Sequence, residues 1–233
     1  MTIRSNSGTV AYDLARHFRV VDLTAALNEQ TPCYPGDPRF TQSWHAQFAD
    51  SGFCVSKLQL GAHTGTHVDA PLHFLGNGSP GVIEVPLQRF MGEALALDRP
   101  KEPGEDVTVN DLAGAEIMPG DIVLFRTGWD GRAGSPAFFE DEWPGLQPTL
   151  VEDLIRRGAK AVGGDIASVD SPTALAAGAP AHKVAARAGM PVFEALVNLD
   201  QVTEKRFYFF GFPLKLEGCE ASPIRAVALV FQS

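Results

Sequence analysis

Three histidines and one aspartate lie within a single run of eleven residues, His63-Thr64-Gly65-Thr66-His67-Val68-Asp69-Ala70-Pro71-Leu72-His73. Imidazole and carboxylate groups are the ligands that zinc, manganese and iron take from proteins. A bound metal with an open coordination position lowers the pKa of water toward neutrality. For any one of these histidines alone, a polar loop with satisfied hydrogen bonds would be the preferred interpretation. For the whole run, the ligand types and their spacing favour a metal site.

We predict that this run forms a turn followed by a short extended stretch. On a helix, the four-residue spacing of His63 and His67 would place both on one face. A glycine and β-branched residues between them disfavour a helix, and Pro71 prevents its continuation. Side chains alternate in an extended stretch, so His67 and Asp69 should share a face. His73 lies beyond the proline, and we expect it to enter the same cavity without binding metal.

The composition is that of a globular chain, with 233 residues of which 45% are hydrophobic and 20% charged. We interpret residues 1–233 as a single domain. The net charge of −9 argues against binding to nucleic acid or to an anionic membrane surface. Residues 1–9 lack the apolar core of a signal peptide, and no apolar run has the length of a membrane span.

The three cysteines, Cys33, Cys54 and Cys219, are expected to be reduced thiols in a cytoplasmic protein. The alternative is that one of them is a catalytic cysteine, but none of the three lies in a sequence motif typical of a cysteine nucleophile. The chain contains no G-x-S-x-G motif and no P-loop. The usual serine-hydrolase route and a nucleotide cofactor are therefore not predicted.

The hydrophobic pattern predicts an α/β fold, rich in strands and with few helices. Strands are expected over 20–27, 53–60, 121–127, 159–166, 206–210 and 224–231, and 82–97 fits either a strand or a helix. Helices are expected over 111–117, 149–157 and 181–188, the first with Asn110 and the second with Thr149 as N-cap.

His182 and Glu194 form a second, weaker pair of candidate ligands. His182 lies in the first turn of the expected helix over 181–188, and Glu194 follows the apolar residues 190–193. A carboxylate buried among such residues needs a partner, because burying it alone is costly. A solvent-facing Glu194 is an equally good interpretation from these residues alone.

The run 63–73 resembles the H-x-G-T-H-x-D-x-P-x-H signature of the cyclase family of metal-dependent hydrolases, which includes bacterial kynurenine formamidase and isatin hydrolase. The resemblance extends over nearly the whole chain, through segments at 22–24, 34–37, 127–129, 144–146, 181–194, 213–215 and 221–226. It implies a swivelling β/β/α fold that assembles as a homodimer or a larger homo-oligomer.

The resemblance also implies roles for individual residues. One divalent metal, Zn or Mn, would bind to His63, His67 and Asp69. Asp69 would bridge to a second metal, held also by His182 and Glu194. His73 would be the acid/base group.

One departure from the family pattern lies in the run Asp165-Ile166-Ala167-Ser168-Val169-Asp170, where many relatives have a threonine in place of Ile166. If this loop touches the substrate, the pocket should be more apolar in this chain. Five aromatic residues are candidates for the pocket wall, and each could equally belong to the core: Phe74, Trp129, Phe138, Phe139 and Trp143.

The resemblance therefore predicts a metal-dependent hydrolase of C–N bonds other than peptide bonds, with a small-molecule substrate. N-formylkynurenine is the leading candidate. The alternative is a cyclic amide, such as isatin, or a lactone. A hypothesis of a different class is a metal-binding protein on this fold without catalytic activity.

Overall fold

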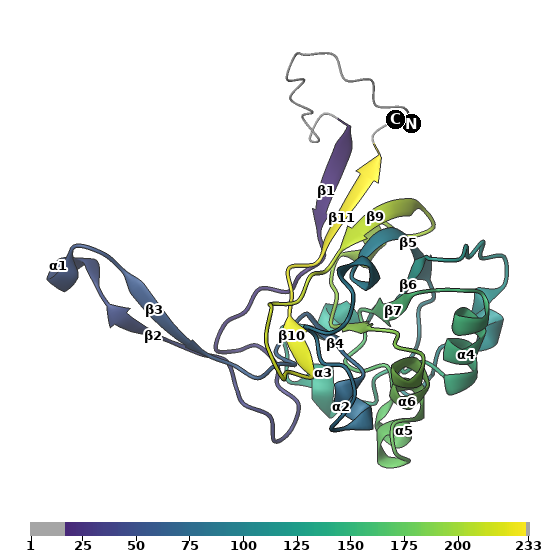
Figure 1. Ribbon diagram of the computed structural model, residues 1–233, viewed down its shortest axis with the longest axis horizontal. Helices are drawn as coiled ribbons and strands as arrows, with labels where there is room; N and C mark the ends of the chain where they lie inside the picture. The colour runs from purple at the N-terminus through teal and green to yellow at the C-terminus, as the bar shows by residue number, and fades with distance from the viewer. Residues whose placement is uncertain (1–16, 232–233) are drawn as a thin grey trace.

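A mixed sheet of nine strands organises the computed structural model, which describes residues 17–231 (Figure 1). In spatial order the strands are β1 (Phe18–Asp22), β11 (Val227–Phe231), β9 (Arg206–Phe210), β5 (Met91–Asp98), β6 (Ile122–Arg126), β7 (Ala161–Gly164), β8 (Val192–Glu194), β4 (His67–Asp69) and β10 (Ala221–Pro223). The four strands from β5 to β8 are parallel, and the pairs toward both ends of the sheet are antiparallel.

The sheet curls around its inner face. Phe193 on β8 and Phe209 on β9 have ring centroids 4.8 Å apart, although three strands separate β8 from β9 in the sheet. Their contact is possible only because the sheet bends toward itself. The enclosed side chains form the larger of two main apolar cores.

Helices cover the opposite face of the sheet. Side chains alternate along β6, so that Ile122 enters the inner core and Val123 packs with the second core. That second core lies under α4 (Pro148–Arg156) and α6 (Pro180–Arg187), which pack against each other. Shorter α-helices are α1 (Phe48–Ser51), α2 (Leu72–Leu75), α3 (Ala137–Glu140) and α5 (Pro172–Ala176), and 3₁₀ turns are formed at Leu87–Arg89, Val109–Leu112, Trp129–Arg132 and Leu199–Gln201.

A separate antiparallel hairpin of β2 (Thr41–Ala46) and β3 (Val55–Gln59), tipped by α1, extends away from the body (Figure 1). The predicted strand over 53–60 is confirmed as β3. The apolar/polar alternation that predicted it indicated one buried face, but every residue of β3 is exposed.

Most of the predicted elements are present with shifted ends, and the prediction of a strand-rich α/β fold with few helices is confirmed. The strand over 206–210 matches β9, and those over 121–127, 159–166 and 224–231 match β6, β7 and β11 within a few residues. The first strand ends at Asp22, five residues before its predicted end. The undecided segment 82–97 contains a 3₁₀ turn and then β5.

The predicted helix over 111–117 is wrong. The chain forms only a 3₁₀ turn, Val109–Leu112, and its N-cap is Thr108 instead of Asn110. Thr108 and Asp111 form a reciprocal capping box, which starts the turn two positions earlier than the prediction. The helix predicted over 149–157 is present as α4, but Gln147 is its N-cap in place of Thr149.

Candidate metal centre and active site

The turn before β4 orients the first candidate ligands, His67 and Asp69. Gly65 has a φ of +64°, and a Cβ atom there would lie 2.5 Å from Leu27 Cδ2, so a side chain would be both strained and obstructed. The Gly65 carbonyl lies 2.9 Å from His67 Nδ1 and leaves the other ring nitrogen of His67 to face inward. Val68 enters the apolar core, while His67 and Asp69 share the other face of β4, as predicted.

The second pair of candidate ligands meets the first inside the fold. Glu194 lies opposite His67, because β4 and β8 are antiparallel neighbours in this register. His182 comes from the first turn of α6. His182 and Glu194 are both buried, so the interpretation of Glu194 as a solvent-facing residue is wrong.

Several buried nitrogen and oxygen atoms that could bind a metal point toward one another without a hydrogen-bond partner. Four buried side-chain atoms have no hydrogen-bond partner among the described residues: His67 Nε2, His182 Nε2 and both carboxylate oxygens of Asp69. Asp69 Oδ1 lies 3.4 Å from His67 Nε2, and Asp69 Oδ2 lies 3.5 Å from His182 Nε2. Buried polar groups are normally satisfied, so a set of unsatisfied atoms facing one point fits an enclosed cation.

The electrostatics of this cluster lead to the same interpretation. Burial lowers the pKa of His67, but the carboxylates of Asp69 and Glu194 outweigh burial and raise it to about 10. Burial raises the pKa of Glu194 and so does Asp69, yet the imidazole rings of His182 and His67 beside the carboxylate bring it down to about 2. The two buried carboxylates therefore need positive charge beside them, which protons or a divalent metal can supply.

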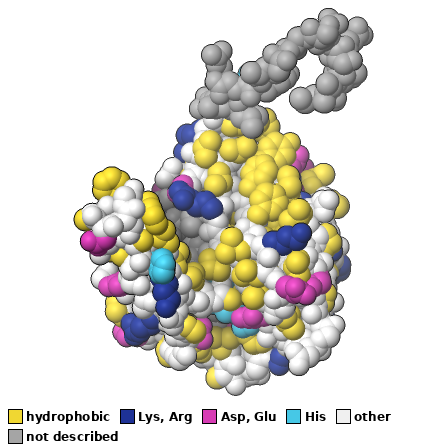
Figure 2. Space-filling view, turned by 60° about the vertical axis from the view of Figure 1, so that its left-hand side comes forward, with side chains coloured by type: hydrophobic (Ala, Val, Ile, Leu, Met, Phe, Trp, Pro, Cys, Tyr) yellow, Lys and Arg dark blue, Asp and Glu magenta, His cyan; other side chains and the backbone are white. Residues whose placement is uncertain are grey.

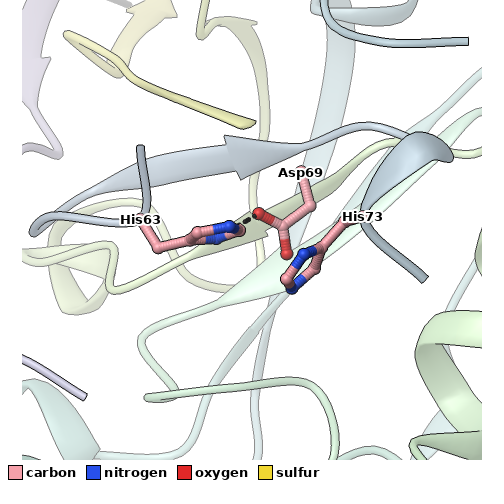
Figure 3. A group of neighbouring side chains, drawn as sticks. All are labelled: His63, Asp69 and His73. Atoms are coloured by element: carbon pink, nitrogen blue, oxygen red, sulfur yellow. Dashed lines mark ion pairs between the residues drawn. The ribbon is translucent and has the colours of Figure 1, made fainter. Parts of the chain in front are cut away.

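His63 and His73 stand at the open side of the cluster, and both rings face the Asp69 carboxylate (Figure 3). His63 Nδ1 lies 2.9 Å from Asp69 Oδ1. Two groups have ligand atoms within 4.8 Å of one another, His63–Asp69–His73 and His67–Asp69–Glu194. The geometry brings all six predicted site residues together. It also makes His73 capable of metal binding, so its assignment as a non-ligand stays a prediction.

Two carboxylates behind the histidines were not among the predicted site residues. Asp170 is fully buried, and its Oδ2 lies 2.7 Å from His182 Nδ1 and accepts a hydrogen bond from the His182 backbone N–H. Glu220 Oε1 lies 3.3 Å from His63 Nε2. Carboxylates in this position hold an imidazole in one tautomer and orientation. Asp170 could have been found, since it ends the sequence run that contains Ile166.

We expect Asp170→Asn to weaken metal binding by about 10–100-fold, because it removes the charged partner that orients His182. Metal affinity is to be measured by competition with a chromophoric chelator. Asp200→Asn, at an exposed position outside the cluster, is the matched control. An Asp170→Asn protein with wild-type metal affinity would show that Asp170 only caps α6.

A cavity of about 630 Å³ opens above this cluster. Three of the predicted aromatic residues, Phe74, Phe139 and Trp143, line it. The other two, Trp129 and Phe138, do not; they are buried in a small apolar cluster with Ala167 and Ala195. Tyr34 also lines the cavity and was not predicted to do so.

The expectation that Ile166 makes the pocket more apolar is wrong. The Ile166 side chain is fully buried in the core beneath α4 and α6. Its neighbours Ala167 and Ser168 line the cavity instead, since the chain bends through this loop. The side chain of Ile166, at which the sequence differs from the family pattern, therefore does not line the cavity.

Asp165, the first residue of the same loop, is a buried carboxylate with a structural role. Its oxygens accept hydrogen bonds of 2.7 Å each from the Thr127 N–H, the Thr127 hydroxyl and the Gly128 N–H. Burial is the largest effect and raises the pKa of Asp165 to about 6, despite these donors. Asp165 thereby fixes the turn that follows β6.

We expect this pKa to make stability depend on pH. Between about pH 4 and pH 6 the folded protein holds a proton on Asp165 that the unfolded chain has lost, so the free energy of unfolding falls as the pH rises through this window. Asp165→Asn cannot titrate. Its stability relative to wild type should therefore rise with pH, by about 1.4 kcal/mol per unit of pKa difference. Wild type and Asp165→Asn are to be unfolded in urea at pH 4.5 and 6.5, after metal has been removed with a chelator. A difference in the free energy of unfolding between the two proteins that is the same at both pH values would contradict the prediction.

Comparisons with known proteins identify a family and several relatives of this chain. Residues 21–171 match the sequence profile of the family described as putative cyclase. A kynurenine formamidase of Delftia acidovorans is 36% identical over 213 residues, covering 90% of this chain and 96% of that protein. A kynurenine formamidase of Salinibacter ruber is 34% identical over 220 residues, covering 89% and 96%.

Solved structures show the same fold. An isatin hydrolase bound to the product analogue thioisatinate superposes with a TM-score of 0.85 at 29% identity, over 94% of this chain and 95% of that one. Isatin hydrolase A of Ralstonia solanacearum gives a TM-score of 0.86 at 28% identity, over 98% and 100%. With the sequence match and the converging ligand atoms, these similarities show that the chain belongs to the cyclase family of metal-dependent hydrolases.

Proposed function

We propose that this protein is a metal-dependent arylformamidase that hydrolyses N-formylkynurenine. The observation that carries the proposal is the set of unsatisfied histidine and aspartate atoms at the floor of a cavity with aromatic walls. The similar kynurenine formamidases support the choice of an aryl formamide. A cyclic amide such as isatin is the second candidate, supported by the close structural similarity to isatin hydrolases.

We propose that two divalent metals, Zn or Mn, share Asp69. Its Oδ1 lies near His63 and His67, and its Oδ2 lies near His182, so the carboxylate can bridge two ligand sets. Glu194 completes the second set, with Oε1 3.2 Å from His182 Nε2. Divalent metals at such a site lower the pKa of water and polarise a carbonyl oxygen.

The protein side chains account for the remaining steps of hydrolysis. Water adds to the formyl carbon, the C–N bond breaks, and the aryl amine leaves after its nitrogen takes a proton. We assign that proton to an imidazole nitrogen of His73, which lies at the open side of the cluster where the amide would enter. Burial lowers the pKa of His73, so its ring is mostly neutral at pH 7 and can first accept a proton from water.

The test is a substrate panel of N-formylkynurenine, isatin and a simple aryl lactone, with Zn-loaded, Mn-loaded and chelated protein. We expect the highest kcat/KM on N-formylkynurenine and no turnover after chelation. Better turnover of isatin or the lactone by orders of magnitude would replace the formamidase assignment with the second candidate. Metal binding without turnover of any compound would favour the non-catalytic hypothesis.

We also propose that residues 1–233 act as one domain in the cytoplasm. The pairing of β1 with β11 joins the two ends of the described chain in one sheet, which supports a single domain. Cys33, Cys54 and Cys219 are all unpaired, which supports a reducing compartment. No helix among residues 17–231 has the length and apolarity to cross a membrane.

We propose further that the protein is a homodimer held by the β2–β3 hairpin. Two-stranded hairpins are marginal alone in water, and this one exposes five large apolar residues, Trp44, Phe48, Phe53, Val55 and Leu58. Figure 2 shows apolar side chains gathered on the hairpin and on the body beside it. Val20 and Phe231, on neighbouring strands β1 and β11, are both more than half exposed. A second copy of the chain can therefore cover both surfaces.

We expect Trp44→Ser combined with Phe48→Ser to convert the dimer to a monomer, because it removes two exposed apolar anchors of the hairpin. Size-exclusion chromatography with light scattering measures the mass. Val109→Ser removes an exposed apolar side chain outside the hairpin and is the control. A wild-type protein that is monomeric at micromolar concentration would refute the dimer.

A further inference from the structure

Three aromatic rings stand almost at right angles to one another in the substrate cavity. The ring centroids of Tyr34 and Phe139 are 5.9 Å apart at 88°, and those of Phe139 and Trp143 are 6.1 Å apart at 84°. Tyr34 and Trp143 close the set at 6.4 Å and 74°. An ammonium group over an open face of one of these rings would lie within about 6 Å of its centroid, the range of cation–π attraction.

A carboxylate accompanies this three-ring cluster. Asp37 follows Tyr34 in one tight turn, in which the Asp37 N–H donates a hydrogen bond of 3.0 Å to the Tyr34 carbonyl. Asp37 lines the same cavity as the three rings. Within residues 17–231, its carboxylate makes no ion pair and no hydrogen bond, so its charge is available to a ligand.

Apart from the histidines at its floor, the cavity is lined by no positively charged side chain of the described chain. Among its lining residues there is no lysine and no arginine, whereas Asp37, Glu220 and Glu194 are acidic. The proposed metals lie at the floor, beside His67 and Glu194. Away from the metals, the cavity therefore attracts cations and repels anions.

We propose that Asp37 and the three-ring cluster form a subsite for an alkylammonium group. The preferred substrates are then aryl amides whose side chain carries a protonated amine, and Asp37 determines that preference. This inference rests on the proposed arylformamidase function and adds to it a named subsite. It also makes a specific claim about N-formylkynurenine: its ammonium group is recognised, and its carboxylate contributes nothing favourable.

The test compares three aryl formamides with the same skeleton: N-formylkynurenine, its analogue without the carboxylate, and its analogue without the amine. For the metal-loaded wild-type protein we expect kcat/KM to be highest for the cationic analogue, lower for the zwitterion and lowest for the anion. Asp37→Asn should reduce the cation-to-anion ratio of kcat/KM by about 10-fold. Tyr34→Leu should reduce the same ratio and Tyr34→Phe should retain it, since only the leucine lacks an aromatic face. Asp200→Asn is the control for loss of one negative charge.

The outcomes separate this inference from the proposed function. Turnover of all three compounds with equal efficiency, or a ratio unchanged in Asp37→Asn, overturns the subsite and leaves the arylformamidase proposal intact. If none of the three is turned over, the proposed function fails. Calorimetric titration of metal-loaded protein with the deformylated cationic and anionic analogues then tests the subsite alone. Tighter binding of the cation, weakened in Asp37→Asn, supports it, and equal binding overturns it.

Discussion

His73→Ala is expected to retain its bound metal and to lose turnover by about 10²–10⁴-fold, the usual contribution of a positioned acid/base group. His73 lies on α2, beyond the strand that carries His67 and Asp69; its ring faces the Asp69 carboxylate and lines the cavity. Removing it leaves five other candidate ligands. The measurements are kcat/KM on the best substrate of the panel and metal content by elemental analysis.

The control for His73→Ala is His17→Ala, which removes an exposed histidine that does not line the cavity. His73 also lies close enough to Asp69 to act as a ligand. Loss of metal together with activity would therefore assign His73 to the ligand set, and the source of the leaving-group proton would have to be sought elsewhere. Retention of both metal and activity would remove His73 from the mechanism.

His67→Ala is expected to lose most of its metal and, with it, essentially all turnover. His67 is buried between Asp69 and Glu194, within 3.4 Å of an oxygen of each, so its removal opens both ligand sets at their centre. Elemental analysis after dialysis against buffer without metal measures the loss. His67→Ala and His17→Ala are to be prepared side by side.

A second readout guards against misfolding of the His67 variant. If His67→Ala retains the wild-type circular dichroism spectrum and lacks metal, the loss belongs to the site. Wild-type metal content in the folded variant would show that His67 is not a metal ligand. His67→Ala also removes a charged neighbour of two buried carboxylates, so we expect the variant to unfold at a lower temperature than wild type.

The candidate site was predictable from the sequence because its residues have unusual chemistry at close spacing. His63, His67, Asp69 and His73 fall in one short run, and strand periodicity alone places His67 and Asp69 on one face. Glu194 could not be placed in the same way. Its position depends on the pairing of β4 with β8, a contact between segments more than a hundred residues apart that no local pattern encodes.

Local patterns also failed where tertiary packing decided the outcome. The alternation in β3 resembles that of a half-buried strand, yet the chain places this strand in a hairpin whose residues are exposed. Ile166 was expected to make the pocket more apolar if its loop touched the substrate. Its actual direction follows from the loop path, which turns the side chain beneath the helices. Asp37 and Tyr34 are separated from the ligands by a hairpin, so their arrival in the same cavity could not be inferred.

The position of β4 in the sheet has a consequence for how the protein folds. β4 lies between β8 and β10, strands that are synthesised long after it. Non-local strand pairing is slow to form, because the chain must first close a long loop. A nascent chain that ends before Glu194 has four of the five proposed ligands in sequence but no complete partner strand to align those on β4. Metal capture is therefore expected to be one of the last events of folding, after which the ion joins the two halves of the chain and slows their separation.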